Sequence, residues 1–113
     1  MMRVLTEYGM GSSLRRGDQT EAAARGLRDA LWRNSIRAAE VFGRDKSEMR
    51  LAVKVGVPVP EDVDVAALRE VFPYGTPDIE VVEGGLSVPH PSGEGEALVM
   101  AAVSITVSFG EDA

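Results

Sequence analysis

Residues 6–20 read TEYGMGSSLRRGDQT, and this stretch decides the fold because a strand, a loop and the start of a helix follow one another in it. Residues 2–8 are predicted to form the strand, which ends at the Gly-Met-Gly of residues 9–11. The loop then carries hydroxyl groups and arginines directly in front of helix N–H groups. Such an arrangement is typical of a binding site for a small anionic ligand.

A helix is predicted to follow this loop. Asp18 and Glu21 have the D-x-x-E spacing of a helix N-cap, so the helix is expected to start at Asp18 or Thr20 and to end near Asn34. Apolar residues then recur at helical spacing and predict one buried stripe along the helix. These residues are Ala22, Ala23, Leu27, Ala30, Leu31 and Ile36.

Further along the chain, apolar residues alternate with other residues, which predicts strands. Strands are expected over residues 49–57 and 97–109, each with its odd-numbered apolar residues on the buried side. A short helix capped by Asp62 or Asp64 is expected to follow the first of them.

A further strand is predicted over residues 78–83, followed by a loop from 84 to 95. Because no helix separates this strand from the last one, the two are expected to pair antiparallel. The whole chain, residues 1–113, is expected to form a single α+β domain. Its strand–helix–strand–helix–strand–strand order predicts a mixed sheet with both helices on one face.

Two helices can cover only one face of such a sheet, so the other face is left open. The residues predicted on the open face are small and of mixed polarity: Ala52, Lys54, Gly56, Ala102, Ser104 and Thr106. A subunit interface or a ligand cavity suits such a face better than bulk water, which predicts a homo-oligomer. A monomer with a solvated sheet face is the alternative.

The charge and composition of the chain argue against several classes of function. A formal net charge of −6 and few aromatic residues disfavour nucleic acid as a partner. The absence of cysteine excludes disulfides, thiolate catalysis and cysteine-ligated metals, and a single histidine excludes a histidine-rich metal site within one chain. No apolar run reaches the length of a membrane span and no signal peptide is recognisable, so the expected location is the cytoplasm, without a membrane partner.

Five short motifs, in their order and spacing, resemble the Listeria-type Lin family of small conserved hypothetical proteins. They are Glu7-x-Gly9-Met10-Gly11, Asp18-x-Thr20-x-Ala22-Ala23, Arg28-Asp29-Ala30, Pro73-Tyr74-Gly75 and Glu83-Gly84-Gly85-Leu86. The resemblance extends from about Arg3 to Phe109. The order of elements also resembles the Bacillus-type chorismate mutase fold, shared with YjgF-like proteins. Members of that fold are typically trimers with sites in clefts between subunits, so this resemblance implies a trimer.

Two residues are candidates for acid–base catalysis. Glu7 stands at the end of the first strand, a common place for functional side chains in open α/β sheets, and can act as a base or hold the arginine loop. Lys54 lies in mid-strand on the open face near Ser104 or Thr106, which suggests the Ser–Lys pair of some hydrolases. A solvated lysine and a structural Glu–Arg pair are the alternatives.

The candidate ligand-binding residues are Gly11, Ser12, Ser13, Arg15, Arg16 and Glu83. Arginine side chains can fork onto a carboxylate or a phosphate, and solvated loop arginines are the alternative. The serines have no base beside them in the sequence, which argues against a nucleophile. No cofactor is expected, because Leu14 replaces the third glycine of a dinucleotide motif and the Gly-Lys-Ser/Thr of a P-loop is missing. No metal is expected either: Glu7, Asp18 and Glu83 could together hold magnesium, but nothing in their spacing indicates it.

These features together predict an oligomeric protein with a small-molecule site at a subunit interface. The expected ligand is anionic or carries a carbonyl group. The sequence leaves open whether a reaction is catalysed there. A non-catalytic structural or regulatory oligomer is the alternative.

Overall fold

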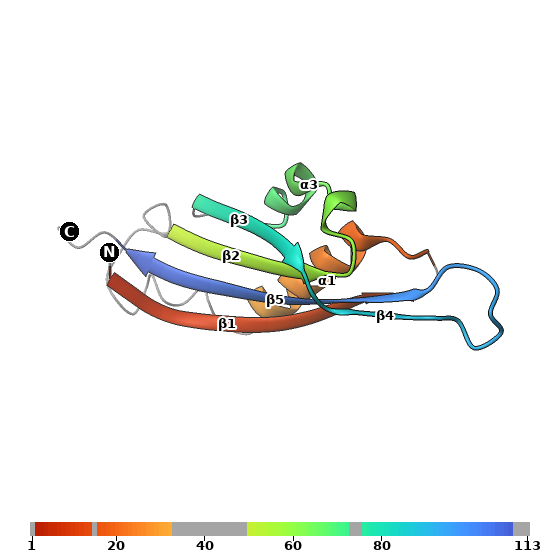
Figure 1. Cartoon of the computed structure of the whole chain (residues 1–113). Helices are drawn as coiled ribbons and strands as arrows, with labels where there is room; N and C mark the ends of the chain where they lie inside the picture. Colours follow the sequence, from red (N-terminus) through yellow and green to blue (C-terminus); the bar gives the residue numbers. More distant parts are fainter. Residues whose placement is uncertain (1, 15, 33–49, 73–75, 110–113) are drawn as a thin grey trace.

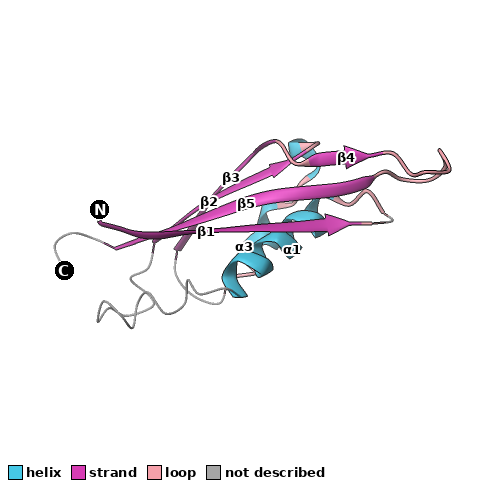
Figure 2. Ribbon diagram, turned by 90° about the horizontal axis from the view of Figure 1, so that it is seen from below, coloured by secondary structure: helices cyan, strands magenta, loops and turns pink. Residues whose placement is uncertain are grey.

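The computed structural model describes residues 2–14, 16–32, 50–72 and 76–109, which form a five-stranded mixed sheet and two α-helices. The strands are β1 (Met2–Ser13), β2 (Arg50–Val57), β3 (Thr76–Glu83), β4 (Leu86–Val88) and β5 (Leu98–Phe109). The helices are α1 (Gln19–Trp32), the 3-10 helix η2 (Pro60–Asp62) and α3 (Val65–Arg69). Both α-helices lie on the same face of the sheet (Figures 1 and 2). The predicted α+β mixed sheet is therefore confirmed.

The order of strands in the sheet differs from the prediction in one respect. The order is β1-β5-β2-β3, so β3 lies beside β2 and pairs with it in parallel, whereas β5 lies between β1 and β2. The predicted pairing of residues 78–83 with the last strand is wrong. The reason is that η2 and α3 form a crossover connection, which returns the chain alongside β2 in the same direction.

The segment predicted as a loop from 84 to 95 contains the short strand β4. Gly84 extends the β2–β3 ladder, since its N–H donates to the carbonyl of Val57 at 2.9 Å. Gly85 has a positive φ of 67°, and a Cβ there would overlap the carbonyl oxygen of Met100. Only glycine fits this crossing, which brings the chain from β3 to the edge of β5, where Leu86 pairs with Met100.

The core lies between the sheet and the two helices. The odd-numbered residues of β2 and β5 point toward the helices and are at most 5% exposed. They are Leu51, Val53, Val55, Val57, Val99, Ala101, Val103, Ile105, Val107 and Phe109. Ala22, Ala23, Leu27 and Ala30 of α1 and Leu68 of α3 close the core from the other side. The sides predicted for the described apolar residues of these two strands are confirmed, and Met49, the first residue of the predicted strand 49–57, lies outside the described residues.

Strand β1 is longer than predicted, because it continues through Gly9, Met10 and Gly11 to Ser13. Gly9 and Gly11 are not hinges, and neither has a positive φ. Both face α1, and a Cβ on either would overlap the backbone of Gly26. Glycine is needed here because strand and helix backbones approach each other closely.

Helix α1 begins where the sequence predicts. The carboxylate of Asp18 accepts a hydrogen bond from the N–H of Glu21 at 3.0 Å, which confirms the N-cap. The helix is described as far as Trp32, so the expected end near Asn34 and the apolar Ile36 lie outside the described residues. Asp64 caps α3 in the same way through the N–H of Ala67. Among the described residues, no helix is long and apolar enough to cross a membrane.

Candidate functional site

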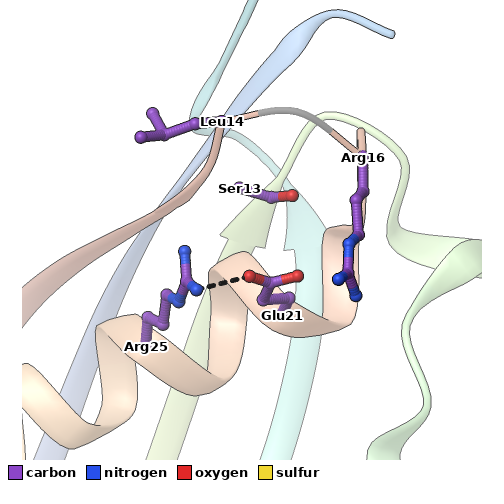
Figure 3. Close-up of a pocket in the computed structure, with 5 residues that line it drawn as sticks. All are labelled: Ser13, Leu14, Arg16, Glu21 and Arg25. Carbon is purple, nitrogen blue, oxygen red and sulfur yellow. Dashed lines mark ion pairs between the residues drawn. The ribbon is translucent and has the colours of Figure 1, made fainter.

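A hollow of about 540 Å³ lies beside the first turns of α1, where the loop from β1 enters the helix (Figure 3). Its lining residues are Ser13, Leu14, Arg16, Glu21 and Arg25. We refer to it as the Arg16 hollow. It combines the end of β1, the loop after it and the start of α1, the same region in which the sequence predicts a seat for an anion.

Ser13 forms the floor of the Arg16 hollow and is 1% exposed. Its Oγ accepts a hydrogen bond from the backbone N–H of Asp18 at 3.2 Å, so it holds the N-cap residue of α1 in place. Leu14 points to the other side of the chain from Ser13 and is 58% exposed (Figure 3). The serine therefore has a structural role, and its hydroxyl faces the hollow as well.

Two arginines flank this floor. Arg25 forms an ion pair with Glu21 at 2.6 Å, one helical turn away, and its Nη1 donates to the carbonyl of Ser12 at 2.8 Å. Arg16 is exposed and has no ion-pair partner among the described residues. In Figure 3 the side chains of Arg16 and Arg25 lie on either side of Glu21. Arg25 is thus held in a fixed position, while the charge of Arg16 is available.

The loop between Arg16 and the helix has a defined backbone. Gly17 has a φ of 59°, and a Cβ there would lie 2.9 Å from a carboxylate oxygen of Glu96, in the loop before β5. The positive φ disfavours a side chain at this position, whereas the carboxylate of Glu96 could move aside. The loop that presents Arg16 lies against the far end of the β4–β5 hairpin.

β1 is an edge strand of the sheet, and side chains of α1 form hydrogen bonds with backbone groups on its free edge. The N–H of Met10 donates to Oδ2 of Asp29 at 3.1 Å, and the carbonyl of Ser12 accepts from Arg25. Unpaired backbone groups on an edge strand can pair with strands of other molecules. Asp29 and Arg25 provide hydrogen-bond partners for two of these backbone groups. Arg25 therefore bonds to the edge of β1 and also lines the Arg16 hollow.

A second hollow, of about 410 Å³, lies on the open face of the sheet, the face without helices. Its polar lining residues are Lys54, Asp78, Glu80, Ser104 and Thr106. Nζ of Lys54 lies 3.8 Å from the carboxylate of Glu80, and the two side chains are 62% and 67% exposed. The strand register confirms that Lys54 lies opposite Ser104, as expected.

The structure does not bring all of the predicted site residues together within one chain. Ser13 and Arg16 share the Arg16 hollow, and Ser12 contributes its carbonyl to Arg25. Gly11 is covered by α1, and Arg15 lies outside the described residues.

The other three predicted residues lie apart from this hollow. Glu7 is on the helix side of the sheet, opposite Ile105, and Lys54 is on the open face. Glu83 is exposed at the end of β3. Only contact between subunits could bring Glu7, Lys54 or Glu83 to the Arg16 hollow.

Sequence reasoning missed Glu21 and Arg25 as lining residues. Their spacing of four residues, at the start of a helix whose N-cap was recognised, is the signal that could have found the ion pair. Within the part of the chain that the structure describes, no group of three or more metal-ligating side chains gathers.

Comparisons with known proteins identify relatives of the chain. A solved structure of an FtsZ-like protein of unknown function from Nostoc punctiforme is 31% identical, with a TM-score of 0.82. That match covers 95% of this chain and 97% of the other. No protein of curated function matches. A family model for conserved hypothetical proteins matches residues 3–107, and the chain therefore belongs to the Lin0512 family.

Proposed function

We propose that this protein is a homo-oligomer that binds a small anionic molecule, bearing a carboxylate or a phosphate, in the Arg16 hollow. The observation that carries the proposal is the placement of two guanidinium groups, of Arg16 and Arg25, around the buried Ser13. Guanidinium groups bind planar or tetrahedral oxyanions through pairs of parallel hydrogen bonds.

The local charge supports an anion rather than a cation. The lining side chains carry two positive charges, on Arg16 and Arg25, and one negative charge, on Glu21. This excess is positive although the chain as a whole has a net charge of −6. The ion pair with Glu21 offsets much of the positive charge of Arg25, so Arg16 supplies most of the electrostatic attraction for an anion. We therefore expect a modest affinity.

The position of the hollow supports a site at a subunit boundary. It is open to solvent and bordered by the exposed Leu14, so a neighbouring subunit would be needed to enclose a ligand. The resemblance to the Bacillus-type chorismate mutase fold stays a prediction. The trimer that this resemblance implies stays a prediction as well. The Nostoc punctiforme relative is a protein of unknown function, so the ligand class is inferred from the residues of the hollow itself.

A structural or regulatory oligomer without a ligand is the second candidate. It is favoured by the internal roles of Gly11, Ser13 and Asp18, which hold helix and strand together. Lys54 and Glu7 are the groups we propose for acid–base chemistry, should subunit contact bring one of them to the ligand. Their separation within one chain supports no specific reaction.

The test is a thermal-shift titration with inorganic phosphate, citrate and a nucleoside monophosphate, each compared with sodium chloride at equal ionic strength. A ligand at 100 times its Kd adds about 2.7 kcal/mol to the free energy of unfolding. We expect Arg16→Ala to lose the shift. Arg69→Ala, which removes an exposed arginine of α3, is the matched control and should keep it. An equal shift in the wild type and in Arg16→Ala would overturn the proposal.

A further inference from the structure

Among the described residues, four of the five large apolar side chains that are exposed lie on the half of the open face that leads into the β4–β5 hairpin; the fifth is Leu14. Tyr8 and Met10 of β1 are 68% and 60% exposed, and Leu86 and Val88 of β4 are 58% and 45% exposed. The register places all four on the open face, because their partners on β5 have even numbers, whereas the odd-numbered residues of β5 are buried under the helices. We call these four residues the apolar end.

We propose that a second copy of this chain packs against the apolar end. The proposal rests on the homo-oligomer of the proposed function and does not depend on the ligand. Monomeric proteins rarely expose contiguous apolar patches larger than a few hundred Å², and larger patches mark interaction sites. The end is also continuous with the short hairpin of β4 and β5, which extends beyond the rest of the sheet (Figure 1).

The area of the open face is close to the area that each partner buries in a stable interface, so two copies can pack sheet against sheet. β1 and β5 have 12 residues each, and β2 and β3 have 8 each. At about 3.3 Å per residue and about 4.8 Å between strands, these four strands present roughly 630 Å² in projection. The accessible surface is larger than the projection because side chains protrude from it. A stable interface buries about 800 Å² on each partner, so a second sheet of the same kind can meet this need.

The charges on the open face favour a copy of the chain over other partners. Its charged side chains, among those described, are Arg50, Lys54, Asp78 and Glu80, whose charges cancel. The described side chains of this face carry no net charge and so do not repel their own copy, even though each chain has a net charge of −6. Both signs are present, so the Lys54–Glu80 region can pair with its counterpart across a symmetric contact.

A membrane surface fits the same residues less well. Apolar groups that dock on anionic lipids are normally flanked by lysine or arginine. The loop next to Val88 carries Glu94 and Glu96 instead. The same acidic loop and the neutral face give nucleic acid no basic surface to bind.

The experiment is measurement of molar mass by size-exclusion chromatography with light scattering. We expect the wild type to give a multiple of 12.1 kDa, and Leu86→Glu and Met10→Glu each to shift the mass toward 12.1 kDa. Ser87→Glu is the matched control, because Ser87 is exposed on the same short strand but on the opposite side from Leu86. It should keep the mass of the wild type.

Two results would overturn the proposal: a monomeric wild type, or variants on both strands that retain the wild-type mass. Far-UV circular dichroism checks that each variant is folded. The substitutions lie on different strands, so if one variant does not fold the other decides the question. A loss of mass in Ser87→Glu as well would also count against it, since the effect would then not be specific to the apolar end. A monomeric wild type would also remove the homo-oligomer from the proposed function, whereas retention of mass by both variants would count against the apolar end alone. Ligand binding is tested separately, by the phosphate titration of the wild type and Arg16→Ala.

Discussion

Gly11 of β1 lies directly against Gly26 of α1, so close that a Cβ on Gly11 would overlap the backbone nitrogen of Gly26. Gly9 meets the carbonyl oxygen of Gly26 and the backbone of Ala30 in the same way. The Gly-Met-Gly motif is thus a packing surface that lets α1 approach the strand. The only side chain in the motif, Met10, points to the open face.

Replacement of Gly11 by alanine should strongly destabilise the fold. The added methyl group would meet backbone atoms on the helix, which cannot rotate away, so strand and helix must separate. We expect a loss of about 3 kcal/mol or more, at or above the upper end for an overpacked core. Chemical denaturation followed by circular dichroism measures it.

The matched control for this variant is Gly93→Ala. A Cβ there meets nothing within 4 Å, but φ is 76°. It should cost only about 1 to 2 kcal/mol, the penalty of a left-handed backbone. Equal losses in the two variants would show that the contact with Gly26 is not what requires glycine at position 11.

The link between Ser13, Asp18 and α1 should contribute to stability as well. Ser13→Ala removes the acceptor for the N–H of Asp18, and a partly buried donor without an acceptor costs about 1 to 3 kcal/mol. Asp18→Ala removes the N-cap and should cost about 1 kcal/mol, whereas Asp18→Asn keeps an acceptor for Glu21 and should cost little. Denaturation midpoints compared at constant m-value give these differences. A destabilised Asp18→Asn would indicate that the negative charge, rather than the hydrogen bond, stabilises the helix start.

The sequence predicted the elements whose signals are local. Period-two alternation over residues 50–57 and 98–109 and the D-x-x-E cap at Asp18 each depend on a few neighbouring residues. A glycine looks alike in a loop and in a strand, so the sequence alone places the end of β1 at the Gly-Met-Gly motif. What requires these glycines is the close approach of α1. The β2–β3 pairing depends on a crossover, and β4, with three residues, is too short to show periodicity.

The candidate site was predictable to a similar degree. Arg16 and Ser13 could be placed together because they lie three residues apart in one loop. The contact of Arg25 with the carbonyl of Ser12 could not, because it joins a helix to a strand edge. Lys54 was correctly placed on the open face by alternation, but the sequence gives no measure of its distance from the loop.

Asp29 should protect the edge of β1. Its carboxylate accepts from the N–H of Met10, and a hydrogen bond to a charged group contributes about 1.5 to 3 kcal/mol. Asp29→Ala should therefore make the amide of Met10 exchange with solvent at least about tenfold faster, because 1.4 kcal/mol corresponds to a factor of ten. Hydrogen exchange followed by NMR measures this directly. Asp29→Asn, which keeps an oxygen acceptor, should exchange more slowly than the alanine variant, and equal rates in both would contradict the assignment.

Lys54 should contribute little to the stability of a single chain and nothing to phosphate binding in the Arg16 hollow. Its ion pair with Glu80 spans 3.8 Å between two side chains that are more than half exposed, and such pairs contribute less than about 1 kcal/mol. Lys54→Ala should therefore unfold within about 0.5 kcal/mol of the wild type. The phosphate-induced thermal shift should also be unchanged, because Lys54 and Arg16 lie in different hollows. Loss of that shift in Lys54→Ala, with the molar mass preserved, would mean that subunit contact brings Lys54 to the ligand. In that case Lys54 of a neighbouring chain completes the site at the subunit boundary, and the prediction that Lys54 contributes nothing to phosphate binding is wrong.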